Sequence, residues 1–288
     1  MTKVIVNVLG SAQDAGIPHP NCFCEQCEKS LADNKFRRYA ASLAIVLPEK
    51  NTWHLVDASP DFKEQLSTFQ MRYGFQGQLM ESIFLTHAHI GHYLGLLFLG
   101  REAIGSKEIP TYAGIKMKHL LEKEAPWSQL TAQGNIDIKE IIEGEVIQVD
   151  EGVRIRPVEV PHRNEFSETF GFWIEGPKRK LLYIPDIDSW EEWHIDIHKA
   201  AKEADIILVD ATFHSIKEIE DFGRDYREIP HPVMTDTMDR LQDLVGETEI
   251  YFTHFNHTNP AIDASHAFTK QVINRGFHIA SEGMELEI

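Results

Sequence analysis

The sequence is poor in cysteine and in basic residues, and it contains no long apolar run. Its 288 residues include three cysteines, and 28 Lys and Arg stand against 45 Asp and Glu, which gives a net charge of −17. Residues 94–99 form the longest apolar run, far short of the ~20 residues of a membrane span. An acidic chain also lacks the basic surface that nucleic acid or an anionic membrane would require. We therefore expect a cytoplasmic protein that binds neither of them.

The chain shows no linker, no repeat and no signal peptide, so we expect one domain over residues 1–288. Hydrophobic residues make up 42% of the sequence, which excludes disorder for most of it. A long loop is expected over 10–27, a mixed stretch around 116–123, and a helix that starts at Ser59 as N-cap with Pro60 next. Further predicted strands are 4–9, 43–47, 53–57, 83–85, 146–149, 153–160, 170–175, 180–184, 206–210 and 250–253; further predicted helices start near 92 or cover 191–203, 232–245 and 262–274. This order suits two sheets packed face to face with helices outside, an α/β/β/α sandwich.

Histidine is abundant, with 15 residues, and three of them follow the predicted strand 83–85. His87 and His89 are two residues apart, so on an extended backbone both side chains point the same way. His92 opens the next helix and can face a neighbouring position. Because neutral imidazole is a common ligand of zinc and similar metals, this spacing favours a metal site over an idle polar loop.

This pattern resembles the metallo-β-lactamase superfamily, whose signature after a strand is His-x-His-x-Asp-His. The resemblance extends over the whole chain and implies the four-layer sandwich and a centre of one or two metals. It implies that His87, His89 and His162 hold the first metal and that His92, Asp186 and His254 hold the second, with Asp186 as the bridge. It also implies that Asp57, at the end of a strand, is an acidic residue beside the ligands.

The sequence departs from the signature at one position, where Gly91 replaces the Asp. The second site then keeps three protein ligands, still enough for a catalytic zinc. We expect the second metal to bind more weakly than the first. Gly91→Asp should tighten that site if the backbone tolerates a side chain there. Asp188 is a weaker candidate to substitute for the missing carboxylate.

All three cysteines lie close together, as Cys22, Cys24 and Cys27. A cytoplasmic chain is not expected to form disulfides, so the alternatives are idle or redox-active thiols and a structural zinc with a fourth ligand from elsewhere. One similar branch of the superfamily, the cyclic phosphodiesterases of phosphonate metabolism, has the same cysteine spacing, and this resemblance implies His257 as the fourth ligand. A second branch, the pyrroloquinoline quinone biosynthesis protein B group, is similar at residues 9–12, 58–61 and 258–260.

His231 precedes a predicted helix at a place where phosphodiesterase relatives carry a histidine that contacts the substrate. The resemblance implies that it protonates the leaving group, and we count it with Asp186 and Asp57 as catalytic; the alternative is a histidine that only begins a helix. Trp190 and Trp193 could line the pocket, but their spacing is more typical of core residues.

These observations predict a metal-dependent hydrolase of a small anionic substrate, most simply a phosphodiester. One or two catalytic divalent metals, zinc, manganese or iron, would lower the pKa of water and give a nucleophile at neutral pH. The alternatives are oxidation or handling of a quinone-cofactor precursor, with iron in the same ligands, and a non-catalytic metal-binding carrier. A homodimer remains open as the assembly.

Overall fold

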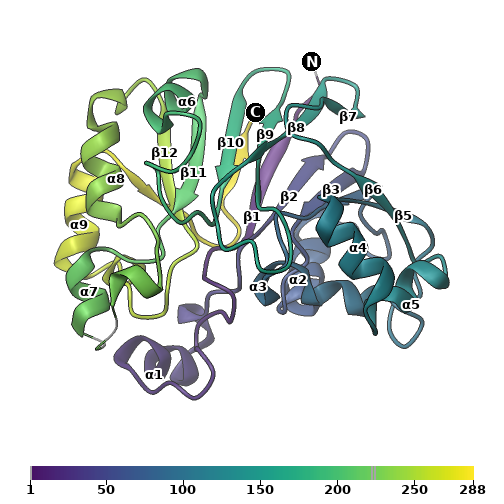
Figure 1. The fold of residues 1–288 in the computed structure, drawn as a ribbon, viewed down its shortest axis with the longest axis horizontal. Coiled ribbons are helices and arrows are strands. Elements are labelled where there is room, and N and C mark those ends of the chain that lie inside the picture. The colour runs from purple at the N-terminus through teal and green to yellow at the C-terminus, as the bar shows by residue number, and fades with distance from the viewer. Residues whose placement is uncertain (1, 222, 224) are drawn as a thin grey trace.

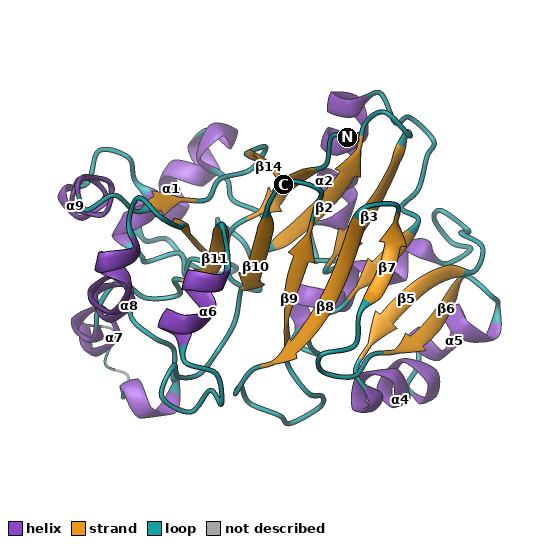
Figure 2. Cartoon of the chain, turned by 90° about the horizontal axis from the view of Figure 1, so that it is seen from above, coloured by secondary structure: helices purple, strands orange, loops and turns teal. Residues whose placement is uncertain are grey.

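The structure is a computed structural model that describes residues 2–221, 223 and 225–288, and two seven-stranded sheets form its centre. The sheets pack face to face, and helices cover their outer faces (Figure 1 and Figure 2). The predicted α/β/β/α sandwich is therefore confirmed.

The first sheet contains mainly strands from the N-terminal half of the chain. Its first three strands in sequence are antiparallel, and the next three run parallel to the third. The last strand of the chain pairs with the first and completes the sheet. In spatial order the strands are β14 (Glu285–Glu287), β1 (Ile5–Gly10), β2 (Ser42–Leu47), β3 (Thr52–Val56), β4 (Ser82–Phe84), β5 (Ile109–Ala113) and β6 (Ile136–Glu140).

The second sheet contains the strands of the C-terminal half. Four neighbouring strands are parallel, and the other three continue the sheet in antiparallel pairs. In spatial order they are β13 (His278–Ile279), β12 (Glu249–Thr253), β11 (Ile206–Asp210), β10 (Lys180–Ile184), β9 (Phe170–Glu175), β8 (Val153–Glu159) and β7 (Ile147–Asp150).

Helices of each half of the chain cover the sheet of that half, and one helix stands apart. Against the first sheet lie α2 (Phe62–Tyr73), α3 (Ile90–Tyr93), α4 (Ile115–Lys123) and α5 (Trp127–Ala132). With the second sheet lie α6 (Ile197–Glu203), α7 (Ile216–Asp221), α8 (Met234–Leu241) and α9 (Ala267–Asn274). Helix α1 (Glu25–Ala32) lies outside the four layers, at the bottom of Figure 1. Short 3₁₀ helices cover Asn34–Phe36, Leu94–Leu99, Tyr226–Glu228, Gln242–Leu244 and Pro260–Ile262.

The alternation of side chains along each strand builds three apolar layers. Phe84 of β4 points between the sheets, whereas its neighbours Ile83 and Leu85 point toward the helices of the first half. Likewise, Leu208 of β11 lies between the sheets, and Ile207 faces the helices of the second half. Successive strand residues point to opposite faces, so a strand buried on both faces is apolar at every position.

Several predicted element boundaries were wrong. Helix α1 begins at Glu25, inside the predicted loop 10–27, and the mixed stretch around 116–123 belongs to helix α4. Helix α2 begins at Phe62, because Ser59 accepts the main-chain N–H of Asp61 in a turn instead of capping the helix. The predicted helix 232–245 divides into α8 and a 3₁₀ turn, and the predicted helix 262–274 begins only at Ala267, as α9.

The predicted helix 191–203 shortens to α6 because two indoles fix the preceding segment by tertiary contacts. Trp190 donates a hydrogen bond to the hydroxyl of Thr237, and Trp193 donates one to the carbonyl of Glu159. Both indoles are buried in the core of the second half. They are core residues, as their spacing suggested, although they do not lie on a helix.

In the part of the chain that the structure describes, no helix has the length and apolar character needed to cross a membrane.

The packing between the sheets predicts a large cost for removing Phe84. Its ring stacks on Tyr112 with centroids 4.5 Å apart and meets the ring of Phe172 edge-on at 5.8 Å. Phe84→Ala should lower the free energy of unfolding by about 3–5 kcal/mol, measured by urea denaturation. Met71→Ala, at a side chain 76% exposed on α2, is the control and should change it by less than about 0.5 kcal/mol. Equal effects of the two variants would contradict this description of the core.

Candidate metal centre

The predicted ligands lie in turns that follow strands of both sheets, at one edge of the sandwich. His87 follows β4, Asp186 follows β10 and His254 follows β12. The last two strands belong to one parallel set, and the carboxyl ends of parallel strands meet at the same edge of a sheet. Segments far apart in the sequence are thereby brought together.

The first group of predicted ligands converges on one point. The ligand atoms of His87, His89, His162 and Asp186 all lie within 4.8 Å of one another. Oδ2 of Asp186 is 3.1 Å from Nε2 of His162 and 3.3 Å from Nε2 of His87. Nδ1 of His89 is 3.0 Å from Nε2 of His162. One metal ion could therefore contact all four side chains.

The second group lies directly beside the first and shares Asp186 with it. The ligand atoms of His92, Asp186 and His254 also lie within 4.8 Å of one another. Nε2 of His254 is 3.8 Å from the same Oδ2 atom of Asp186. This position between the two groups is the one that a bridging carboxylate would occupy.

Carboxylates outside the two groups fix the orientation of the histidine rings. Nδ1 of His92 donates to Asp57 at 2.7 Å, so its Nε2 points toward the second group. Nδ1 of His162 donates to Asp188 at 2.6 Å, so its Nε2 points toward the first group. Asp57, predicted as an acidic residue beside the ligands, thus positions His92. Asp188 positions His162, a role that the sequence did not indicate.

Two residues of the centre have a backbone conformation that side chains rarely adopt. Asp57 has φ 61° and His254 has φ 63°, both in the left-handed region. Hydrogen bonds hold each of them there: the main-chain N–H and the hydroxyl of Thr86 donate to Asp57, and the hydroxyl of Thr212 bonds Nδ1 of His254. Such strained residues persist where the surroundings fix them, often at functional sites.

The polar atoms of the centre fit a divalent cation. Among the described residues, Nε2 of His87, His92 and His254 and Oδ1 of Asp186 are buried without a hydrogen-bond partner. Buried polar atoms nearly always have one. Imidazole nitrogens and carboxylate oxygens are zinc ligands, so a metal in each group would satisfy the ring nitrogens.

Burial and charge give the ligands suitable protonation states. Burial lowers the pKa of His87 well below its ordinary value and also lowers that of His254, which favours the neutral form that binds metals. Burial acts in the same direction on His162, but Asp186 and Asp188 outweigh it and raise its pKa to about 10. These carboxylates therefore favour a positive charge at this place, whether a proton or a metal ion supplies it.

His231 lies at the edge of the centre, close to Asp186 but turned toward another carboxylate. Its Nδ1 donates to Asp210 at 2.8 Å and lies 3.5 Å from Oδ1 of Asp186. Its Nε2 is buried and, among the described residues, unpartnered. Asp210 was missed by the sequence analysis, although it ends a buried strand as Asp57 nearly does. The position of an Asp at the end of a buried strand, as with Asp57, was the signal that could have indicated Asp210.

A cavity of about 520 Å³ is lined by Arg163, which follows His162 in the sequence, and by Asn256, two residues after His254, but its lining contains none of the candidate catalytic ligands themselves. Its walls come from the N-terminal loop, the turn after β12 and the segment before α8, and His231 lies behind one wall with its ring centroid 6.0 Å from that of Phe213. The lining residues include Gln13, His19, Arg163, Phe213, Asn256 and His257. The lining carries one charge of each sign, from Arg163 and Glu228.

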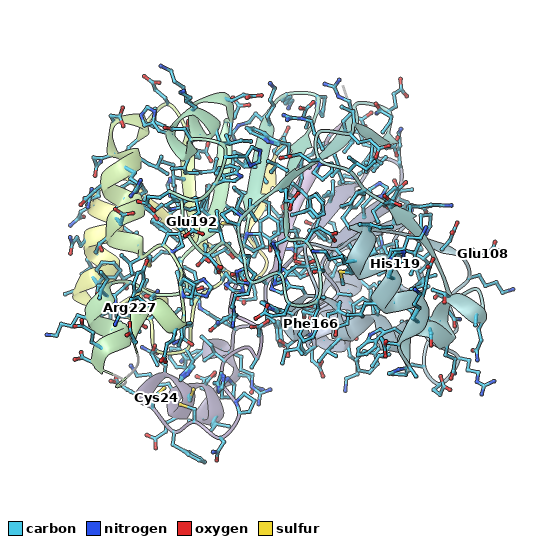
Figure 3. All side chains as sticks on the ribbon, in the orientation of Figure 1. Cys24, Glu108, His119, Phe166, Glu192 and Arg227 are labelled. Carbon is cyan, nitrogen blue, oxygen red and sulfur yellow. The ribbon has the colours of Figure 1, made fainter. Side chains whose placement is uncertain are left out.

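The three cysteines and His257 form a separate cluster at α1, where Cys24 is labelled in Figure 3. Nδ1 of His257 lies 3.4 Å from Sγ of Cys22, 3.5 Å from that of Cys24 and 3.7 Å from that of Cys27. Ligands at zinc–sulfur and zinc–nitrogen distances of ~2.3 and ~2.0 Å in a tetrahedron lie about 3.5 Å apart. All three thiols are free, and the four side chains have the spacing of one zinc site.

The charge states of this cluster also suit a metal. Burial lowers the pKa of His257 to about 4, so its ring is neutral. Burial raises the pKa of Cys27 to about 12, so the thiolate is unstable there without a neighbouring cation. Zinc reverses this effect because a coordinating thiol is deprotonated. The structural zinc itself remains a prediction.

Comparison with known proteins defines the class of this chain. Residues 52–255 match the family described as the beta-lactamase superfamily domain, and the chain belongs to this family. The matched range contains His87, His92, His162, Asp186 and His254, and it ends just before His257.

The relatives agree with both branches named from the sequence. Coenzyme PQQ synthesis protein B from Nitrosococcus oceani is 27% identical over 98% of this chain and 99% of its own length, and the protein of that name from Methylococcus capsulatus is 26% identical with the same coverage. The crystal structure of zinc-bound PqqB from Methylobacterium extorquens has a TM-score of 0.83 and 25% identity over 99% of this chain and 100% of that one. A diphosphatase of the PhnP family, with a TM-score of 0.71 and 24% identity over 99% and 97% of the two chains, shares the fold.

The cysteine cluster predicts that Cys24→Ser removes one zinc per chain and destabilises the protein. Because binding energy at a structural zinc is folding energy, a loss of about 2 kcal/mol would lower Tm by roughly 4–8 °C. Zinc content by mass spectrometry and Tm by calorimetry test this prediction. Phe23→Ser, at a side chain 71% exposed between two of the cysteines, should leave both values unchanged. An unaltered zinc content in Cys24→Ser would contradict the assignment.

Proposed function

We propose that the protein is a metal-dependent hydrolase whose substrate is a small phosphodiester. The observation that supports this most strongly is the arrangement of His231, which has one ring nitrogen fixed by Asp210 and the other free, next to the predicted metal ligands. A histidine held in this way can give a proton to a leaving oxygen. Metal ions bound in the two groups would supply Lewis acidity and lower the pKa of water, which is the chemistry that such a hydrolysis requires.

The charge of the site favours an anionic substrate. Five of the six predicted ligands are histidines, so the ligand set returns one negative charge, from Asp186, against the four positive charges of two divalent cations. Coulomb attraction is stronger in a partly dry cleft than in water, so an anion is favoured over a neutral lactam or ester.

The size of the substrate is limited by the charge of the whole protein. A net charge of −17 repels long polyanions before they reach the cleft. The cavity of about 520 Å³ has room for a small molecule. Together these features favour a small phosphodiester over RNA or DNA.

The second candidate is a role like that of the PQQ synthesis protein B relatives, oxidation or handling of a quinone-cofactor precursor with iron held by the same ligands; a third is a non-catalytic metal-binding carrier. The similarity of these relatives over 98% of this chain supports it. Neither of these roles would require the free nitrogen of His231 to protonate a leaving group.

The proposal predicts that the metal-loaded protein hydrolyses bis(p-nitrophenyl) phosphate or a small cyclic phosphate, with little nuclease activity. His231→Gln should lower kcat about 10²–10⁴-fold, because a general acid is lost, while metal content by mass spectrometry stays unchanged. Removal of the metals by a chelator should abolish the activity.

The matched control is His194→Gln, at a half-exposed histidine that pairs with Glu143 outside the centre; it should retain full activity. If the metal-loaded wild type hydrolyses no phosphodiester, the quinone-precursor role replaces the hydrolase. If His231→Gln keeps full activity, another group supplies the proton.

The pair of Asp210 and His231 predicts a change in pH dependence. Burial lowers the pKa of His231, but Asp210 outweighs it, and the net pKa is raised. A general acid works while it is protonated, so kcat should fall as pH rises through this raised pKa. Asp210→Asn should lower the pKa, so the alkaline fall of kcat should move to lower pH, measured from pH 5 to 10. An unchanged alkaline limb would show that Asp210 does not act through His231.

A further inference from the structure

A carboxylate outside the predicted ligand set lies where the signature Asp is missing. Asp14 is in the loop after β1, and its Oδ1 accepts the main-chain N–H of Gly91 at 2.9 Å. A Cβ atom added at Gly91 would lie 2.4 Å from Cα and 2.5 Å from Oδ1 of Asp14. Asp14 therefore occupies the space that a side chain at position 91 would need.

The side chain of Asp14 also faces the second group of ligands. Its Oδ1 is 4.0 Å from Nε2 of His92, and its side chain is 24% exposed, so it lies on the solvent side of the centre. In a tetrahedral site, two oxygen or nitrogen ligands at about 2.0–2.2 Å from one zinc lie about 3.3–3.6 Å apart. Asp14 lies just outside the group formed by His92, Asp186 and His254, and a small rotation of its carboxylate toward His92 would bring it to that distance. Nε2 of His92 and of His254 are buried and, within the described residues, have no other partner.

The loop that carries Asp14 is fixed to the segment that carries His254. The main-chain N–H of Gln13 donates to the carbonyl of Phe255 at 2.9 Å, and that of Phe255 donates to the carbonyl of Ser11 at 2.9 Å. Asp14 follows Gln13 and His254 precedes Phe255 in the sequence. Main-chain hydrogen bonds thus set the place of the carboxylate relative to the second group.

We propose that Asp14 is the fourth protein ligand of the second metal and supplies, from the N-terminal loop, the carboxylate that the signature lacks at Gly91. The proposal rests on the metal centre of the proposed function. The second metal would then have His92, His254, Asp186 and Asp14 as ligands. With two carboxylates against two divalent cations, the centre remains positive and still favours an anionic substrate.

Under this proposal, two expectations drawn from the sequence change. Gly91→Asp should not tighten the second site, because the new side chain would collide with the main chain of Asp14. A weaker second metal is also no longer expected, because the missing carboxylate is replaced. Asp14 was missed because it lies 77 residues from Gly91 in the sequence, and only the fold brings the two together.

The test measures metal binding directly. Wild type should hold two catalytic metals in addition to the zinc of the cysteine cluster, and Asp14→Asn should hold one, by mass spectrometry after dialysis. Calorimetric titration of zinc should show the affinity of the second site reduced by more than the roughly 10–100-fold that loss of a ligand's hydrogen-bond partner costs. Asn keeps an oxygen for the N–H of Gly91, so the loop should keep its conformation.

Two further variants complete the test. Glu165→Gln is the matched control, because this carboxylate lies 3.7 Å from Nε2 of His89, a ligand of the first group, but is 48% exposed and does not occupy the space beside Gly91; it should keep both catalytic metals. Gly91→Ala should push Asp14 away and weaken the second site, as Asp14→Asn does. Retention of the cysteine-bound zinc and of Tm checks that each variant is folded.

The proposal is overturned if wild type binds a single catalytic metal, or if Asp14→Asn binds the second metal as tightly as wild type. Neither readout uses a substrate. If Asp14→Asn loses the second metal while the metal-loaded wild type hydrolyses no phosphodiester, Asp14 is still supported as a ligand but the proposed function is refuted. The two failures can therefore be told apart.

Discussion

The carboxylate of Asp186 is the interaction on which the rest of the centre depends. Its Oδ2 lies within 4 Å of a ring nitrogen of His87, His89, His162 and His254, which come from turns on both sheets. The side chain is 2% exposed, and burial alone would raise its pKa, but His162 and His254 keep that pKa well below the ordinary value. The sandwich thus holds an ionised carboxylate in a dry place, which is stable only if positive charge surrounds it.

Because the centre gathers buried histidine rings around Asp186, most of these rings have a polar partner at the ring nitrogen that points away from the centre. Asp57 lies behind His92, Asp188 behind His162 and Asp210 behind His231, each at Nδ1. Because one nitrogen of each ring is occupied, the other is directed into the centre with a defined tautomer. Two of these carboxylates lie at or next to the ends of buried strands, so the sheets hold the rings from the side away from the candidate metal sites.

Sequence patterns predicted most strands and the fold, because alternation and continuous apolar runs mark buried strands well. They also indicated the ligand histidines, which lie close together or follow strands. They missed β5, β6 and the short strands β13 and β14, and they missed Asp188 and Asp210 as residues that position rings and Asp14 as the proposed ligand. The reason is physical: a carboxylate acquires its role from the ring it meets across the fold, and single acidic residues in an acidic chain carry no local signal.

The cysteine cluster and the second metal group are parts of one arrangement. Residues 11–27 contain the proposed ligand Asp14 and the three cysteines, and residues 254–257 contain both His254 and His257, so the same two segments would carry ligands of both. Helix α1 buries only Cys27 and Ser30 and cannot hold this loop by apolar packing alone. A zinc in the cysteine cluster would fix the loop against the turn after β12 and so hold Asp14 beside His92 and His254. In this arrangement a metal in the cysteine cluster would act on the candidate centre through the geometry of one loop.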